Sequence, residues 1–216
     1  MADKKVKTST VVLQQLDAQY TEWYTGRMDD NRSRLLACAL DLFAARGYDG
    51  VGVQEVADAA GLKKPTLYHY FGSKSGLLKT LLDENFVELF NALIPASTYH
   101  RDVASTLQAL AIEYFKFAEK HPKFYRLQLS MCFAPPESPA FTAVSALYIK
   151  QQHMLEAFFM RASEDHGNMK GRQRAYAATF LGMLNTYISI SLNGYTGMDD
   201  DLAQKAVHQF MHGIFS

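Results

Sequence analysis

The sequence predicts an all-α protein with about nine or ten helices, and three observations support this fold class. Apolar residues recur at spacings of three and four in one segment after another, as on the buried face of an amphipathic helix. Glycine or proline separates most of these segments, as expected at helix ends. No segment alternates apolar and polar residues in the manner of a β-strand, and no internal repeat is evident.

The composition is that of a globular protein with a substantial core. The chain has 216 residues, of which 48% are hydrophobic, with 14 Phe and 12 Tyr, which suffices for one or two domains. No run of about 18 apolar residues occurs, so no membrane-spanning helix is expected. Met1–Lys5 begins no apolar signal segment, and two cysteines, Cys38 and Cys132, are too few for a disulfide framework. A cytoplasmic location is therefore expected.

Three regions follow one another along the chain, namely residues 1–29, 30–80 and 81–216. The first is expected to form a tail and an extra amphipathic helix over residues 9–25. The apolar residues of this helix recur at helical spacing and are Val12, Leu16, Tyr20 and Trp23. Its role is left open between packing on the following domain and packing on a partner subunit.

Residues 30–80 are predicted to form a small domain of three helices. Asp30 or Asn31 caps the first helix, and Gly47 ends it. A second, short helix ends at Gly61, and Pro65 occupies the first turn of a third helix, where its missing N–H costs nothing. Two short helices joined by a glycine turn form a helix-turn-helix. The polar and basic residues of the third helix then face outward, as in a domain that reads DNA.

The net charge of the whole chain is zero, yet this small domain is basic. Residues 31–80 contain seven Lys or Arg and four Asp or Glu, and seven minus four gives +3. A local basic face is what phosphate binding requires, so the neutral total does not argue against a DNA partner.

Residues 34–82 resemble the N-terminal domain of TetR/AcrR-type transcriptional repressors. The resemblance rests on an ordered signature, which runs Leu42-Phe43, Gly47-Tyr48, Val56-Ala57-Asp58-Ala59-Ala60-Gly61, Thr66-Leu67-Tyr68-His69-Tyr70-Phe71, Ser73-Lys74 and Leu77-Leu78. It implies a homodimeric repressor that binds a palindromic operator in double-stranded DNA and is released by a small-molecule effector. It implies neither an enzyme activity nor a cofactor.

The residues predicted to contact DNA surround the third helix. They are Lys63, Lys64, Pro65, Thr66, Tyr68, His69 and Lys74, together with Arg32. Lys64 and Thr66 suit base edges in the major groove, whereas the resemblance makes Tyr68, His69 and Lys74 mainly phosphate contacts. Gly52 stands where the family usually has a hydroxyl that touches phosphate, so that contact is expected to be absent. The basic tail fits either an arm in a DNA groove or an ordinary solvated terminus.

The remaining chain is expected to be a larger helical domain for effector binding and dimerisation. Ser73 can cap a long helix from Lys74 to about Leu93, which leaves the small domain and enters the larger one. Pro95 is expected to end it. Further helices are predicted over 102–120, 141–165, 172–192 and 199–215, and a short helix is predicted after His121-Pro122 with Phe124, Tyr125, Leu127 and Leu129.

The last two helices are predicted to form the dimer interface as a four-helix bundle with a second copy. They carry apolar residues beyond what one core needs: Tyr176, Phe180, Leu184, Ile188, Val207, Phe210 and Met211. The alternative is that both helices cover only the core of a single chain.

The middle of the chain is rich in aromatic residues and methionine, and an effector cavity is predicted there. The residues expected to line it are Phe86, Phe90, Tyr114, Phe117, Gln128, Met131, His153, Phe158, Met183 and Tyr187, with His121 and Asn185 as further polar candidates. Plain core packing is the alternative. Few charges fall on these faces, so an uncharged apolar or aromatic effector is expected.

Metal and enzyme chemistry find little support in the sequence. His208 and His212 have a metal-compatible spacing but no third ligand in view, so no metal site is predicted. No phosphate-binding loop, nucleophile elbow or paired-cysteine motif occurs. The alternative function is a helical small-molecule-binding protein or enzyme that keeps the motif without binding DNA.

Overall fold

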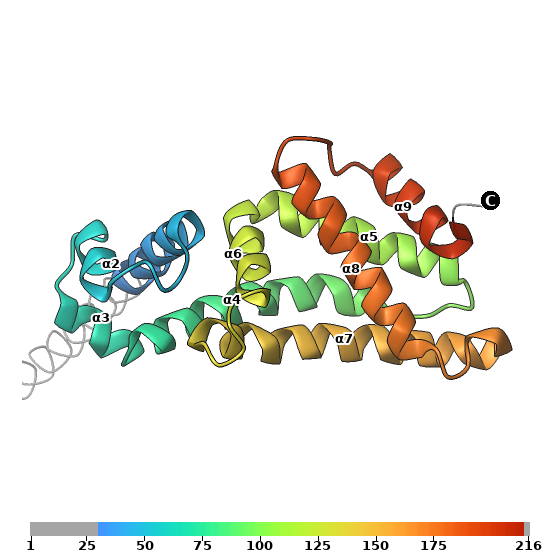
Figure 1. The fold of residues 1–216 in the computed structure, drawn as a ribbon, viewed down its shortest axis with the longest axis horizontal. Helices are drawn as coiled ribbons and strands as arrows, with labels where there is room; N and C mark the ends of the chain where they lie inside the picture. The colour runs from blue at the N-terminus through green and yellow to red at the C-terminus, as the bar shows by residue number, and fades with distance from the viewer. Residues whose placement is uncertain (1–29, 214–216) are drawn as a thin grey trace, which may run out of the picture.

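The computed structural model describes residues 30–213, which are helical and contain no β-strand (Figure 1). The predicted all-α fold class is thereby confirmed. The predicted tail and extra helix in residues 1–29 lie outside the described residues, as do residues 214–216. No helix within the described part of the chain is long and apolar enough to cross a membrane.

The predicted helix-turn-helix is present. Residues 30–46 are helical, and α2 (Val53–Ala59) and α3 (Lys64–Phe71) follow. Gly61 adopts a φ of +65° after α2, in the left-handed region that only glycine enters without cost. The N–H of the next residue, Leu62, bonds back to the Ala57 carbonyl. The glycine therefore reverses the chain between the two helices, and we call this small domain, residues 30–73, the head.

Helix α4 (Lys74–Ala96) connects the head to the rest of the molecule. The Ser73 hydroxyl caps it by accepting a hydrogen bond from the Gly76 N–H at 2.9 Å, as predicted. The expectation that Pro95 ends the helix is wrong, because α4 passes through Pro95 to Ala96. The proline removes one backbone donor, but the N–H of the following Ser97 still bonds to the Leu93 carbonyl at 2.8 Å.

The larger domain, which we call the body, packs α5 (Val103–Lys120), α6 (Pro122–Cys132), α7 (Pro139–Asp165), α8 (Gln173–Leu192) and α9 (Asp200–His212) around the second half of α4. A short 3-10 turn, η1 (Gly167–Met169), separates α7 from α8. Helices α4 and α7 run side by side, α8 crosses α7, and α9 lies on α5 at the end away from the head (Figure 1). The largest fully buried side chains of the body are aromatic and include Tyr114, Phe115, Phe124, Tyr125, Phe158 and Phe180.

The turn at Gly61 gives a testable prediction about stability. Gly61→Ala should destabilise the protein by about 1–2 kcal/mol, because alanine must adopt the left-handed conformation. The added Cβ would also lie 3.1 Å from the Arg34 guanidinium. Gly61→Asn should cost less, since asparagine tolerates this conformation. Denaturant unfolding measures both losses.

The matched control is Gly167→Ala, where no atom lies within 4 Å of the added Cβ and φ is not positive. This control should change stability by less than about 0.5 kcal/mol. Equal stability of the Gly61→Ala and Gly167→Ala proteins would contradict the role given to Gly61.

Candidate DNA-binding face and ligand pocket

Helix α3 presents the predicted polar face to solvent. Leu67 and Phe71 point into the core of the head, with 0% and 8% of their surface exposed. Five of the predicted DNA-contact residues are exposed on the opposite side, namely Lys63, Lys64, Pro65, Tyr68 and His69, and Thr66 is partly exposed beside them. Tyr68 is an unusual surface residue because 41% of this large aromatic side chain meets water.

The positive charge of the head is concentrated beside this face. Four of the seven basic residues counted in the sequence have acidic partners within the structure: Arg32 pairs with Glu84, Arg34 with Asp30, Arg46 with Glu55 and Lys79 with Asp83. Lys63, Lys64 and Lys74 form no direct ion pair among residues 30–213, although Asp49 and Glu55 lie near enough to Lys74 to interact with its charge. The cations without a direct ion pair are thus those at the starts of α3 and α4, where they are available to a phosphate backbone.

Aromatic rings hold two of these lysines in place. The Lys74 ammonium lies 4.1 Å from the centroid of the Tyr48 ring, and the Lys64 ammonium lies 5.7 Å from that of Tyr68. A ring face attracts a cation without neutralising it. Partial burial lowers the pKa of Lys74. Lys74 also sits at the first turn of α4, where free backbone N–H groups favour an anion.

Arg32 differs from the other predicted DNA contacts. Its guanidinium pairs with Glu84 of α4 and lies 5.9 Å from the Phe71 ring centroid, so it joins the head to α4. Its contact with phosphate stays a prediction. Gly52 caps α2 through its backbone, donating its N–H to the Glu55 carboxylate at 2.8 Å, and it has no side chain to offer a phosphate.

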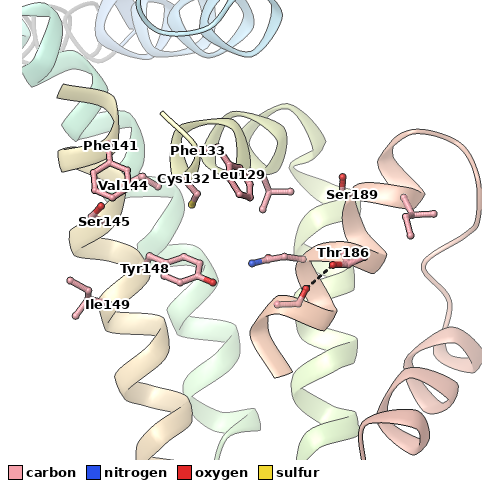
Figure 2. Close-up of a pocket in the computed structure, with 13 residues that line it drawn as sticks. Leu129, Cys132, Phe133, Phe141, Val144, Ser145, Tyr148, Ile149, Thr186 and Ser189 are labelled. Atoms are coloured by element: carbon pink, nitrogen blue, oxygen red, sulfur yellow. Dashed lines mark hydrogen bonds between the residues drawn. The ribbon is translucent and has the colours of Figure 1, made fainter. Parts of the chain in front are cut away.

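A pocket of about 910 Å³ opens in the body between α6, α7 and α8 (Figure 2). Its size lies within the range usual for small-molecule sites. Apolar side chains dominate its wall, namely Leu129, Phe133, Phe141, Val144, Ile149 and Ile190. Its polar lining residues are all uncharged and comprise Cys132, Ser145, Tyr148, Asn185, Thr186 and Ser189. The lining therefore suits an apolar ligand with a few neutral polar groups.

None of the ten residues predicted to contact the effector lines this pocket, and their role stays a prediction. Large side chains fill the core instead of surrounding space: Phe86, Tyr114, Phe117, Gln128, Met131 and Phe158 are buried. His153 is exposed on α7, and Phe90, Met183 and Tyr187 are partly buried outside the lining. Of the two further polar candidates, Asn185 lines the pocket, whereas His121 contacts Glu88 at the start of α6.

The residues that line this pocket follow a pattern that is visible in the sequence. Small or polar residues recur at spacings of three and four on two helices that are otherwise apolar. On α7 these are Ser145 and Tyr148, and on α8 they are Gly182, Asn185, Thr186 and Ser189. Such residues leave room and supply hydrogen-bonding groups, which aromatic residues at the same spacing do not.

Four of the predicted interface residues also need correction. Phe180, Leu184, Ile188 and Val207 are 0–4% exposed in a single chain, so they have no surface to offer a second copy. They form the apolar stripes of α8 and α9, and those stripes face the core of the subunit. Tyr176, Phe210 and Met211 line a smaller pocket of about 250 Å³ at the end of the body.

The outward face of α8 has a different composition. Apart from Arg174 near its start, its exposed residues are small or uncharged: Ala175, Ala178, Thr179, Gly182, Thr186 and Ile190. His208 and His212 stack on α9 with ring centroids 4.6 Å apart. No group of three potential metal ligands occurs among residues 30–213.

Comparison with known proteins identifies the head. Residues 35–81 match the family described as bacterial regulatory proteins, tetR family. The chain is 28% identical over 188 residues to the transcriptional activator FasR from Mycolicibacterium smegmatis, an alignment that spans 87% of the chain and 84% of FasR. The transcriptional repressor KstR2 from Rhodococcus jostii is 35% identical over 86 residues, which span 40% of the chain and 42% of KstR2.

The whole fold also has a match among solved structures. The transcriptional regulator FadR from Bacillus subtilis, crystallised with stearoyl-CoA, superimposes with a TM-score of 0.71 at 16% sequence identity. This alignment covers 84% of the chain and 98% of FadR. At this identity the likeness concerns the fold alone.

The lysines of the head without a direct ion pair give a testable prediction about DNA binding. Lys74→Ala should weaken binding to all sequences alike and reduce the slope of log affinity against log salt by about one, because it removes one phosphate contact. Lys64→Ala should instead cost about 1–3 kcal/mol mainly at one base position and relax preference there. Fluorescence anisotropy on the DNA upstream of the protein's own gene, with single-base variants and a salt series, measures both effects.

Lys170→Ala is the matched control, because Lys170 is exposed in the body, directly after η1, and forms no ion pair among the described residues. It should bind DNA as the wild type does. If Lys74→Ala and Lys64→Ala also leave affinity and salt slope unchanged, this face does not bind DNA.

Proposed function

We infer that this chain, which belongs to the TetR family of bacterial regulatory proteins, is a DNA-binding transcriptional regulator whose hold on DNA responds to a small ligand. The observation that carries this function is the outward face of the helix-turn-helix, where Lys63, Lys64 and Lys74 form no direct ion pair within the described residues. Membership of the family makes the chain a regulator and not an enzyme. The alternative of a binding protein without DNA function would leave these lysines without a role.

We propose that the exposed residues at α3 and at the start of α4 have the two roles predicted from the sequence, base contact and phosphate contact. Lys64 and Thr66 would meet base edges in the major groove. Lys63, Pro65, Tyr68, His69 and Lys74 would position the head on the phosphate backbone, with Arg32 at the margin. One head buries too little surface for tight specific binding, so two heads on a palindromic operator are needed. A DNA partner of this kind supports a location in the bacterial cytoplasm.

The second head would come from a second copy joined through α8 and α9. From residue 175 to residue 192, α8 carries no charged residue, although its outer face is exposed in the single chain. A helix that is uncharged all round is normally covered on both sides. Ala175 and Ala178, which are exposed and lie outside the pocket lining, would allow close approach of a symmetry-related α8, which supports an isologous homodimer.

Ala178→Arg tests this dimer, because it places a charge and a long side chain on the outer face of α8. Light scattering should give twice the chain mass of 24.3 kDa for the wild type and about one chain mass for Ala178→Arg. Ala157→Arg makes the same change on the exposed face of α7 and should remain a dimer. A wild-type protein that is monomeric at micromolar concentration would refute the homodimer.

The pocket between α6, α7 and α8 would be the effector site. Its wall is mostly apolar and its polar groups are neutral, which supports an uncharged ligand with a substantial apolar part. FadR from Bacillus subtilis, with the same fold, was crystallised with stearoyl-CoA, so an acyl chain is a sensible first probe. FasR is an activator and KstR2 a repressor. We propose repression here, relieved by the effector.

Two structural connections would transmit the effect of ligand binding from the pocket to the head. The C-terminal part of α6 supplies Leu129, Cys132 and Phe133 to the pocket. At the opposite end of the same helix, the Lys123 ammonium bonds the Asp41 carboxylate of the head at 2.7 Å. Helix α4 is the second connection. A ligand that favours one placement of α6 would shift the separation of the two heads, and a full reversal of the bound population needs about 5.5 kcal/mol of differential affinity.

Filling the pocket tests this coupling. Stearoyl-CoA should weaken DNA binding by the wild type by about 5–150-fold, the usual range of allosteric coupling. Ser145→Trp places an indole in the pocket and should keep DNA affinity while losing the response. Ser130→Trp is the control, because Ser130 is exposed on α6 outside the lining and should leave the response intact. A response that survives in Ser145→Trp would place the effector elsewhere.

A further inference from the structure

A chain of hydrogen-bonding groups runs through the apolar core of the body to the wall of the pocket. Tyr125 is fully buried on α6, and its hydroxyl donates to the Asn185 side-chain oxygen on α8 at 2.8 Å. Asn185 in turn lines the pocket together with Tyr148 of α7. Helices α6, α7 and α8 thus each contribute one polar side chain to a cluster at the wall of the pocket.

The bond from Tyr125 fixes which way the Asn185 amide points. Because its oxygen already accepts the Tyr125 hydroxyl, its NH₂ group is left to donate on the other side. That side holds Tyr148. Burial raises the pKa of the Tyr148 phenol, and the adjacent Asn185 side chain partly offsets the rise. The polar groups therefore follow one another in the order Tyr125, Asn185 and Tyr148.

The last group in this order has a proton to give. A phenol beside an amide N–H still carries one O–H donor of its own, and no group among residues 30–213 accepts a hydrogen bond from the Tyr148 hydroxyl. Tyr148 projects from α7 across the pocket towards α8 (Figure 2). Donors in series polarise one another, which strengthens the final bond. The free O–H is therefore held ready for an acceptor that enters the pocket.

The absence of charged residues in the pocket lining indicates which kind of hydrogen-bond acceptor the ligand carries. None of the residues that line the pocket is Lys, Arg or His, and none is Asp or Glu. A carboxylate placed beside Tyr148 would lose its hydration without gaining a countercharge, which is costly. A carbonyl oxygen has no charge to desolvate and needs only one or two donors.

We propose that Tyr148, positioned by Asn185 and Tyr125, recognises the carbonyl oxygen of a neutral acyl ligand, an ester, an amide or a thioester, whose apolar chain lies along Val144 and Ile149. This inference rests on the proposed role of the pocket as the effector site. The inner part of the polar core has a purely structural role, since the Tyr114 hydroxyl donates to Gln151 at 3.0 Å away from the lining. Asn185 and Tyr125 are positioning residues, and Tyr148 alone donates to the ligand.

The test compares two probes that differ only in the carbonyl. Decanoyl-CoA has the thioester carbonyl, and S-decyl-CoA, a thioether, lacks it. Calorimetry on the full chain should show decanoyl-CoA binding about fivefold more tightly to the wild type, the effect of one net hydrogen bond. Tyr148→Phe should bring this ratio close to one, and Asn185→Leu should reduce it. Ser189→Ala, which removes a lining hydroxyl outside the series, should keep it.

A second pair of probes shows which chemical class of carbonyl compound the pocket binds. Methyl decanoate should bind and decanoate should bind more weakly, since only the latter carries a charge into the pocket. Binding of decanoyl-CoA without methyl decanoate would restrict the ligand to thioesters of coenzyme A and still support the role of Tyr148. The ratio of the affinities for decanoyl-CoA and S-decyl-CoA is measured on the wild type alone. The inference can therefore be tested even if the Tyr148→Phe protein misfolds.

Three outcomes overturn the inference. These are equal affinity of the wild type for thioester and thioether, a ratio that persists in a folded Tyr148→Phe protein, and failure of every acyl probe to bind. Each of them is distinguishable from failure of the proposed function, because DNA binding by the lysine face is measured separately and without any ligand.

Discussion

The buried stripe along α4 is the packing on which the rest of the structure depends. Leu77 and Leu78 are fully buried near the head end of this helix, and Leu89 and Leu93 are fully buried in the body. The two ends of one continuous helix are thus held in place by packing at both ends. Close-packed interiors transmit a displacement and do not absorb it, so a change around the body end of α4 must move the head or disrupt its packing.

The connection between head and body through α6 is much weaker than the one through α4, and this difference matters for control. The ion pair of Lys123 with Asp41 is well exposed on both sides, and such pairs contribute about 0–1 kcal/mol. It can bias the placement of the head but cannot fix it. A regulator needs this balance, because a head locked to the body by several strong contacts would not respond to the modest free energy that a small ligand supplies.

The head could be predicted from the sequence because its structure is local. Gly61 requires a left-handed turn, Pro65 favours the start of a helix, and the spacing of Leu67 and Phe71 fixes which side is buried. The pocket could not be predicted in this way. Phe86 and Phe158 stand at the same helical spacing as true lining residues, yet they fill the core. Whether a residue lines the pocket depends on how α6, α7 and α8 are arranged around it. The spacing of residues along one helix does not encode that arrangement. The prediction of the dimer interface failed for the same reason. The apolar stripes on α8 and α9 pack into the core of the subunit, and the outer face of α8 carries small residues instead.

The central claim is that the occupied pocket changes the separation of the two heads through α4. Electron spin resonance distance measurement tests it directly, with one label per chain at Gln54→Cys on the exposed side of α2 and with Cys38 and Cys132 replaced by Ser. The label-to-label distance should take one value in the DNA complex and a clearly different one when an effector that releases the DNA is bound. An identical distance distribution in the two states would contradict the claim.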